Sequence, residues 1–366
     1  MRVLILSANT GGGHNSAALA LRECFQKHGA SCEIRDALSF VSDRFSETIS
    51  KGHLYLYRHL PRLFGAGYRY AEHHRIRFVY GWMACGSHRF ASYVNSQRYD
   101  AVVCTHLFGS LLVTEAIKSA HLSILHYLVV TDYALYPGTE LLDVHRLFIG
   151  SESMVQEYSD AGIDRNRLVV SGIPIGSSYF LDKSDRLVRR RLQVSDHEQL
   201  LLLLGGSIGC GRYKRMIPAL LQEVPSTTHL LLVCGNNQRL FKRMQSYASE
   251  RFHIVGYTDE LANFMAAADL CISKPGGLST TELTVVGLPM VLLLSVPGCE
   301  THNLDYFLRQ KTAVGAKNWS EAVLHCSRLL MDTDELASMR QRLIKQNYPG
   351  GAEVVVRTVM MDYTTI

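Results

Sequence analysis

The sequence predicts an α/β protein made of two doubly wound domains. Short apolar segments bounded by Gly, Asn, Asp or Pro alternate with helical patterns, as in βαβ units. The alternation occurs as two separate series, and each series opens with an apolar strand that ends in a glycine-rich turn. At 366 residues, 47% of them hydrophobic, the chain is long enough for two domains with cores of their own.

The strand candidates fall into two groups. The first group is residues 3–7, 101–105, 124–131, 146–149 and 168–171, and the second is residues 200–204, 229–234, 252–255, 270–272 and 289–293. Because strands joined by helical crossovers run parallel, each group predicts one doubly wound sheet. The charged segment after GIPIG (residues 172–176) is typical of a surface helix and linker. We therefore predict domains at residues 1–175 and 176–348, with a C-terminal helix at 349–366 that crosses back to the first.

Composition excludes several classes of protein. The longest apolar runs, residues 200–204 and 290–294, are far shorter than the roughly 18 residues of a membrane span. The first residues carry no signal-peptide cleavage pattern. Nine cysteines are scattered singly, without C-x-x-C or a Cys/His pattern at zinc spacing, as expected for free thiols in a reducing compartment. We expect a cytoplasmic protein without a metal or other cofactor.

A glycine cluster follows the first predicted strand. Gly11, Gly12 and Gly13 precede a helical pattern, so the backbone amides of a helix N-terminus can meet an anionic ligand there. The cluster is not G-x-G-x-x-G, and no acid is placed to bind an adenine ribose, which disfavours a nicotinamide dehydrogenase. His14 comes next, at the strand end where doubly wound folds bind ligands. The alternative is a tight strand-to-helix turn with an incidental histidine.

The second series contains the most informative motif. A strand ends in Lys274, Pro-Gly-Gly follows, and a helix then begins with hydroxyl residues and carries Glu282 one turn inside. That order presents amides to a phosphate and a carboxylate to vicinal sugar hydroxyls. A capped helix with a solvated glutamate is the alternative for each part taken alone. The earlier turn of Gly205, Gly206 and Ser207 lacks the Gly-Lys-Ser/Thr of a P-loop.

Residues 51–98 are basic and aromatic together, with eight Lys/Arg and one acid. Amphipathic aromatics suit a lipid–water interface, where each Lys or Arg gains about 1 kcal/mol near anionic headgroups. A solvated helical face is the alternative. Single-stranded nucleic acid is a weaker candidate partner than a membrane, because the segment is not part of an RNA-binding module. The residues expected at the membrane are Arg58, Arg62, Arg75, Arg77 and Trp82.

Taken together, these motifs resemble a known family. The glycine cluster with His14, GIPI at the domain boundary, VGYTDELANFMAAADLCISKPGG and the GLP…PGCETHN segment are similar to the monogalactosyl and glucosyl diacylglycerol synthases. Those enzymes belong to glycosyltransferase family 28, which includes the MurG-type N-acetylglucosaminyltransferase. The resemblance spans nearly the whole chain and is most specific over residues 255–303. It implies a GT-B architecture: two Rossmann-like domains with an interdomain cleft, the acceptor on the N-terminal domain, the nucleotide sugar on the C-terminal one, and a metal-independent inverting transfer.

The same resemblance assigns expected contacts with a UDP-sugar. Those near the diphosphate are Gly205, Gly206, Ser207, Lys274, Gly276, Gly277, Ser279 and Thr280. Those near the nucleoside and the sugar are Gly256 and Tyr257 for uracil, Glu282 for the ribose, and Glu300 and Asn303 for the transferred sugar. One position departs from the pattern, because Cys299 stands where many members have Gln, and a thiol replaces an amide that both donates and accepts. The identity of the donor sugar is therefore left open.

An inverting transfer needs a base for the acceptor proton and a positive environment for the departing diphosphate. His14 is the leading base, because an imidazole titrates near neutrality. His106 and Asp132 also end predicted strands of the first domain, and each can act as the base, orient it, or have a structural role. Amides, helix N-termini and Lys274 are expected to hold the diphosphate.

These observations predict an enzyme on the inner face of the cell membrane. It would move a hexose from a UDP-sugar to a lipid hydroxyl, with diacylglycerol as the expected acceptor and an anionic membrane surface, but no nucleic acid, as partner. One alternative is transfer of N-acetylglucosamine or another sugar to a different acceptor. Another is a non-catalytic UDP-sugar-binding regulator.

Replacing Arg58, Arg62, Arg75 and Arg77 together by Gln is expected to weaken binding to anionic liposomes. Added salt should weaken the wild-type protein similarly, because the Debye length shrinks to about 3 Å at 1 M. Cosedimentation with anionic and neutral liposomes measures both effects. Attachment that ignores salt would contradict the electrostatic account, and no attachment at all would indicate a soluble acceptor.

Overall fold

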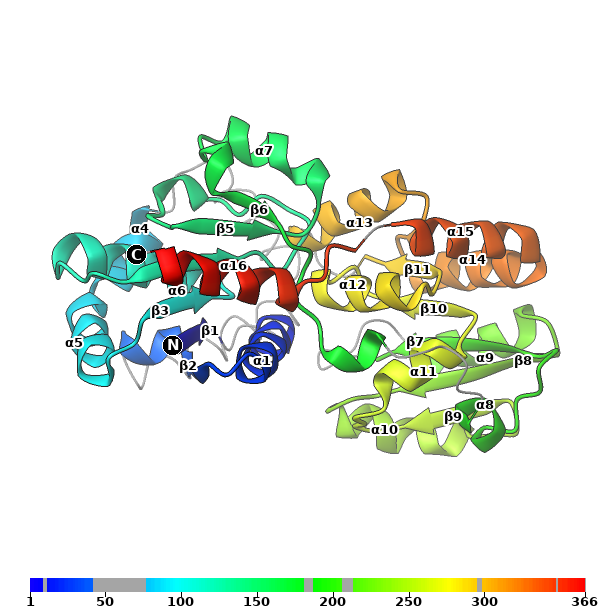
Figure 1. The fold of residues 1–366 in the computed structure, drawn as a ribbon. Helices are drawn as coiled ribbons and strands as arrows, with labels where there is room; N and C mark the ends of the chain where they lie inside the picture. The colour runs from blue at the N-terminus through cyan, green and yellow to red at the C-terminus, as the bar shows by residue number, and fades with distance from the viewer. Residues whose placement is uncertain are drawn as a thin grey trace. The chain divides into compact units, whose positions relative to one another are not determined.

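The computed structural model describes residues 1–8, 12–41, 77–180, 187–205, 213–294, 298–346 and 348–365, without the side chains of residues 77–80. The chain divides into two compact units (Figure 1). The N-terminal unit consists of Met1–Gly176 together with Tyr348–Ile366, and the C-terminal unit is Ser177–Asn347. No helix among the described residues is both long and apolar enough to cross a membrane.

The N-terminal unit is built on a parallel six-stranded sheet with the order β2-β1-β3-β4-β5-β6. Its strands are β1 (Arg2–Ser7), β2 (Ser31–Asp36), β3 (Ala101–Cys104), β4 (Leu125–Val129), β5 (Arg146–Ile149) and β6 (Leu168–Val170). Its helices are α1 (Gly12–Lys27), α4 (Arg77–Ala84), α5 (Ser87–Gln97), α6 (Leu107–Ser119), α7 (Val155–Asp160) and α16 (Ala352–Thr365). The strand order reverses between β1 and β3, and a doubly wound sheet binds ligands at the carboxyl ends of strands beside such a reversal.

The C-terminal unit contains a second parallel six-stranded sheet, with the order β12-β11-β10-β7-β8-β9. Its strands are β7 (Gln199–Leu204), β8 (Thr228–Val233), β9 (Phe252–Val255), β10 (Leu270–Ser273), β11 (Met290–Leu293) and β12 (Ala313–Ala316). Its helices are α8 (Leu187–Arg191), α9 (Tyr213–Glu223), α10 (Gln238–Met244), α11 (Leu261–Ala267), α12 (Gly277–Val286), α13 (Cys299–Arg309), α14 (Trp319–Met331) and α15 (Thr333–Lys345). Here the order reverses between β7 and β10, so the loops that begin at Gly205 and Lys274 flank the reversal.

The central strands are apolar because helices cover both faces of each sheet. In β1 and β7 every residue after the first is buried, a pattern typical of parallel strands with no solvated face. These runs confirm the predicted α/β class with two doubly wound sheets. Strands β2 and β12 were absent from the sequence prediction. Both lie at sheet edges, and β2 (SCEIRD) is polar and only partly buried, so its sequence carries no apolar run.

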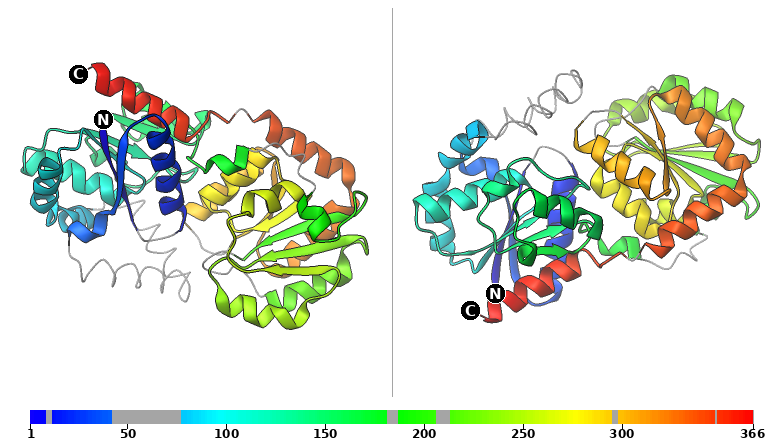
Figure 2. Two further views of the ribbon diagram at one scale, coloured as in Figure 1. Left: turned by 60° about the horizontal axis from the view of Figure 1, so that its bottom comes forward. Right: turned by 90° about the horizontal axis from the view of Figure 1, so that it is seen from above.

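The C-terminal helix α16 belongs to the N-terminal unit and packs beside α1 (Figure 2). Val355, Val356 and Val359 are fully buried in the core of that unit. Toward the end of the helix, Asp362 accepts hydrogen bonds from the Tyr127 hydroxyl at 3.2 Å and from Arg146 at 3.1 and 3.3 Å. The last turns of the chain are thus fixed to the first sheet by apolar contact and by an ion pair.

Candidate active site

His14 lies in the first turn of α1 and is held by residues that follow two neighbouring strands. Its Nδ1 atom is 3.0 Å from the carbonyl oxygen of Thr105, after β3, and 2.8 Å from Oγ1 of Thr131, after β4. The Thr105 hydroxyl in turn donates to the His14 carbonyl at 3.1 Å. Three carboxyl-terminal strand ends, those of β1, β3 and β4, therefore meet at this imidazole.

These contacts determine the tautomer of His14. A carbonyl oxygen only accepts, so the Nδ1 atom that faces Thr105 carries the proton. In the neutral ring the lone pair then lies on Nε2. A half-buried imidazole with a basic Nε2 at the carboxyl edge of a doubly wound sheet has the chemistry of a general base.

A chain of hydroxyl groups connects His14 with Asp132. The Tyr136 hydroxyl donates to Asp132 Oδ2 at 2.7 Å, and Thr131 Oγ1 lies 3.2 Å from the Tyr136 oxygen. Because Tyr136 directs its proton to the carboxylate, Thr131 donates to Tyr136 and accepts from His14, whose single Nδ1 proton is shared between Thr131 Oγ1 and the Thr105 carbonyl. All the donors thus point toward Asp132. Such a chain polarises along its length and stabilises positive charge on the imidazole.

His106 is the N-cap residue of α6, and its role toward the acceptor stays a prediction. Its Nδ1 accepts the backbone N–H of Phe108 at 3.0 Å and so caps the N-terminus of α6. In the neutral ring this leaves the proton on Nε2, which makes that atom a donor. The ring stands edge-on to His14, with centroids 4.5 Å apart. The structure therefore gives His106 a capping role that also fixes the position of the His14 ring.

The glycine cluster is described in part. Gly12 and Gly13 are the first two residues of α1, and Gly11 lies outside the described residues. Gly12 is exposed and Gly13 is half-buried. The first amides of α1 therefore come from residues without a side chain, which suits close approach of an anionic group.

In the C-terminal unit, Lys274 follows β10 and pairs with Glu300 of α13. The Lys274 Nζ atom is 2.9 Å from Glu300 Oε1, and the Glu300 side chain is only 8% exposed. Two residues assigned by the resemblance to the phosphate and to the sugar thus contact one another. On the same helix, the buried Asn303 donates from Nδ2 to the Pro275 carbonyl at 2.9 Å and so fixes the Pro-Gly-Gly turn to α13.

The Pro-Gly-Gly turn leads directly into α12. Gly276 is the N-cap residue and Gly277 begins the helix. The Thr280 hydroxyl donates to the carbonyls of Gly276 and Gly277 at 2.9 and 3.0 Å. Its proton is therefore used in hydrogen bonds within the first turn of the helix. Ser279 is half-buried in the same turn. The roles of Ser279 and Thr280 toward a phosphate stay predictions.

Glu282 is buried on α12, with 7% of its surface exposed, which excludes the alternative of a solvated helix residue. Burial raises the pKa of its carboxyl group to about 8, although a hydrogen bond from Tyr179 acts in the opposite direction. Tyr179 belongs to a short 3-10 helix, Ser177–Phe180, that contacts α12. The carboxyl group is therefore mostly protonated at neutral pH, and the Tyr179 hydroxyl is its hydrogen-bond partner.

Two other predicted donor contacts, Gly205 and Gly256, follow strands at the same carboxyl edge of the second sheet. Gly205 follows β7, and a Cβ there would come 3.0 Å from the Val233 carbonyl oxygen, a close contact that glycine avoids. Gly256 follows β9, and Tyr257 is 65% exposed with its hydroxyl bonded to Asp259. Gly206 and Ser207 are outside the described part of the chain.

The predicted membrane segment, residues 51–98, is described only from residue 77 onward. Arg58, Arg62 and Arg75 lie outside the described residues, and Arg77 begins α4 without a described side chain. Trp82 is half-buried in α4. Contact of these residues with a membrane stays a prediction.

Sequence reasoning missed Thr131, Tyr136 and Tyr179. The first two carry a readable signal, because they flank Asp132 in TDYALY at a strand end, where polar side chains meet a ligand crevice. Tyr179 lies just after the predicted domain boundary, more than a hundred residues before Glu282. Only the folded chain brings these two residues together.

The two units match two different family models. Residues 14–175 match the monogalactosyldiacylglycerol (MGDG) synthase model, and residues 200–349 match the glycosyltransferase family 28 C-terminal domain. Among named relatives, the processive diacylglycerol beta-glucosyltransferase of Bacillus cereus strain B4264 is 28% identical over 371 residues, which cover 99% of this chain and 94% of the relative. The enzyme of the same name from Bacillus mycoides is also 28% identical, over 376 residues, with the same coverage.

Solved structures share the fold at lower identity. MurG of Acinetobacter baumannii superposes with a TM-score of 0.65 at 17% identity, and the superposition covers 98% of this chain and 99% of the MurG chain. Anabaena HepE in complex with UDP gives a TM-score of 0.60 at 14% identity, with full coverage of both chains. The two parallel sheets and these likenesses define the GT-B fold. Residues 200–349 thus match the C-terminal domain of glycosyltransferase family 28, and residues 14–175 match the monogalactosyldiacylglycerol synthase model.

The buried Glu282 predicts a pH-dependent difference in stability between the wild type and Glu282→Gln. The group ionises near 4.5 when exposed but near 8 when folded, so above pH 4.5 the unfolded chain loses this proton first. The stability that the neutral carboxyl contributes is complete below pH 4.5 and is lost as pH rises toward 8. Over that range the wild type should lose about 1.4 kcal/mol per pH unit relative to Glu282→Gln.

Urea unfolding at several pH values measures this difference. Glu250→Gln, at an exposed position, is the matched control and should follow the wild type throughout. Parallel pH curves for the wild type and Glu282→Gln would show that the Glu282 carboxyl is already ionised in the folded protein.

Proposed function

We propose that the chain transfers a hexose from a UDP-sugar to the hydroxyl group of diacylglycerol or a closely related lipid. The proposal rests on the N-terminal unit, which resembles lipid glycosyltransferases in sequence and contains an imidazole with a defined basic nitrogen. The observation that carries it is the orientation of His14, because a protein that only binds a UDP-sugar has no need of a base at this sheet edge. The UDP-bound relatives of the same fold support the choice of donor.

In the proposed reaction, His14 Nε2 removes the proton of the acceptor hydroxyl. The acceptor oxygen attacks the anomeric carbon as the bond from that carbon to the UDP oxygen breaks. The configuration at the anomeric carbon is therefore inverted, and UDP leaves as the anion. The imidazolium that forms is stabilised through Thr131 and Tyr136 by the Asp132 carboxylate. Each hydrogen bond in this chain already points in the direction that the charged ring requires.

The donor is proposed to bind at the carboxyl edge of the second sheet. The amides at the N-terminus of α12 and the Lys274 ammonium would meet the diphosphate and stabilise the leaving group. Glu282 would take the two ribose hydroxyls, and Glu300 and Asn303 would face the sugar. Because Lys274 and Glu300 contact each other, a diphosphate that binds Lys274 also changes the environment of the sugar-binding carboxylate.

A transfer assay tests the proposal directly. The full chain is incubated with liposomes that contain diacylglycerol and with labelled UDP-glucose, UDP-galactose and UDP-N-acetylglucosamine in turn. A glycosylated diacylglycerol from a UDP-hexose supports the proposal. Transfer only of N-acetylglucosamine, or UDP binding without any product, would replace it with one of the two alternatives.

His14→Ala is expected to lower turnover by roughly 10² to 10⁴. UDP affinity should change little, because His14 belongs to the N-terminal unit and the proposed donor contacts to the C-terminal one. Thr131→Val, which removes the hydroxyl link but keeps the shape, should lower turnover by a smaller factor. Steady-state kinetics and UDP titration calorimetry measure both properties, and near-normal turnover of His14→Ala would remove the residue from the mechanism.

UDP binding is expected to favour the ionised form of Glu282, because two ribose hydroxyls donate to the carboxylate and each charge-assisted bond contributes about 1.5 to 3 kcal/mol. UDP affinity should therefore rise between pH 6 and 8, since the unliganded carboxyl has a pKa of about 8 and must lose its proton. Glu282→Ala should weaken UDP binding at least about tenfold.

Calorimetry with UDP and 2′,3′-dideoxy-UDP on both proteins completes a double cycle. The dideoxy analogue also controls for titration of the diphosphate itself, because it carries the same diphosphate. Equal losses of affinity for the two ligands would make Glu282 a structural residue and contradict the placement of the ribose.

A further inference from the structure

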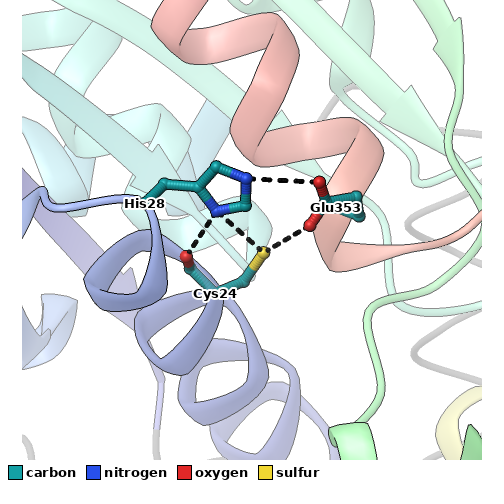
Figure 3. A group of neighbouring side chains, drawn as sticks. All are labelled: Cys24, His28 and Glu353. Carbon is teal, nitrogen blue, oxygen red and sulfur yellow. Dashed lines mark hydrogen bonds and ion pairs between the residues drawn. The ribbon is translucent and has the colours of Figure 1, made fainter.

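A cysteine, a histidine and a glutamate come together in the N-terminal unit, away from His14 on the same helix. Cys24 lies in the last turn of α1, His28 directly follows the end of that helix, and Glu353 lies in the first turn of α16 (Figure 3). Their ligand atoms all lie within 4.8 Å of one another, and all three residues are half-buried. Because Glu353 is 329 residues from Cys24, sequence spacing does not reveal this group.

The hydrogen bonds of His28 leave its second nitrogen in a particular state. Nδ1 is 3.0 Å from the Cys24 carbonyl oxygen, which only accepts, so Nδ1 carries a proton. Nε2 faces Glu353 Oε1 at 3.2 Å. In the neutral ring these two atoms both present lone pairs, and their approach is favourable only with a cation between them, either a proton or a metal ion.

The geometry suits a tetrahedral metal ion. Zn–N and Zn–O bonds of about 2.0 Å and a Zn–S bond of about 2.3 Å place neighbouring ligand atoms roughly 3.3 to 3.5 Å apart. The observed distances are 3.2 Å from His28 Nε2 to Glu353 Oε1 and 3.4 Å from Cys24 Sγ to the other oxygen, Oε2, while Sγ lies 4.0 Å from His28 Nδ1. A single ion would therefore need a small rotation of the Glu353 carboxylate, so that one oxygen meets it together with Sγ and Nε2. The Nδ1–H bond to a backbone carbonyl is also the contact that orients metal-binding histidines in general.

The charges of the group also favour a divalent ion. On metal binding, Cys24 would become a thiolate, which together with the Glu353 carboxylate would neutralise two positive charges, and the mixed sulfur, nitrogen and oxygen ligands suit zinc. Arg357 now donates to Glu353 Oε1 at 2.5 Å, but its side chain is 72% exposed and can turn to solvent. Binding would release the thiol proton and displace that guanidinium.

We propose that Cys24, His28 and Glu353 form a zinc-binding site that joins α16 to α1. The three side chains supply three ligands, and water completes the tetrahedron. The site lies on the helix that carries His14, but ten residues further along it, about 15 Å at 1.5 Å per residue. Its consequence is structural: the ion would fix the C-terminal helix to the first domain, and the transfer reaction itself would not require it.

Cobalt(II) and zinc titrations of the metal-stripped full chain test the proposal. We expect one equivalent of Co²⁺ to bind with a thiolate-to-cobalt charge-transfer band, and Zn²⁺ to displace it. Cys24→Ser should remove the band, and Glu353→Gln should keep it but weaken binding about tenfold or more. Cys85→Ser, which removes an exposed cysteine elsewhere in the unit, is the matched control and should bind as the wild type does.

Hydrogen exchange provides a second readout that does not depend on the spectrum. Zinc should slow exchange of the α16 amides in the wild type and in Cys85→Ser, but not in Cys24→Ser, and circular dichroism verifies that each variant is folded. A charge-transfer band that survives Cys24→Ser would overturn the proposal. So would the absence of stoichiometric binding, which would leave a proton as the cation between His28 and Glu353.

Discussion

A single hydrogen bond, from His14 Nδ1 to the Thr105 carbonyl, determines what the N-terminal unit can do chemically. The carbonyl cannot donate, so the proton stays on Nδ1 and the basic lone pair stays on Nε2. The Thr131 and Tyr136 hydroxyls then have only one consistent set of directions, toward Asp132. Without the carbonyl at this position, the imidazole could exchange tautomers and the hydroxyl chain could reverse.

The parallel sheets explain why such groups gather where they do. In a doubly wound sheet every carboxyl end lies on one edge, so residues distant in sequence become neighbours there. In the proposed function, the first unit would use this edge for a base and its support. The second has Lys274 and the α12 N-terminus there, which suit a diphosphate, and the buried Glu282, which would face the ribose. The Lys274–Glu300 ion pair connects the proposed phosphate and sugar contacts within that unit.

The sequence was sufficient to predict the fold class, because buried parallel strands such as β1 and β7 are continuous apolar runs. It was also sufficient to place His14 and Lys274 at strand ends. It could not reveal that His106 caps α6, because the cap depends on the rotamer of the side chain. Nor could it reveal that Tyr179 contacts Glu282, because the two residues are far apart in sequence and no helix or strand repeat relates them. The Cys24 group was missed for the same reason: its third member comes from the opposite end of the chain.

The tautomer of His14 is the central claim, and long-range nitrogen–proton NMR correlation on ¹⁵N-histidine-labelled protein measures it most directly. His14→Gln identifies the His14 signals by their loss. Above the titration range, we predict that the Nε2 resonance has the shift of an unprotonated nitrogen and that Nδ1 has the shift of a protonated one. A protonated Nε2 in the neutral ring would contradict the account, because the acceptor proton would then have no lone pair to receive it.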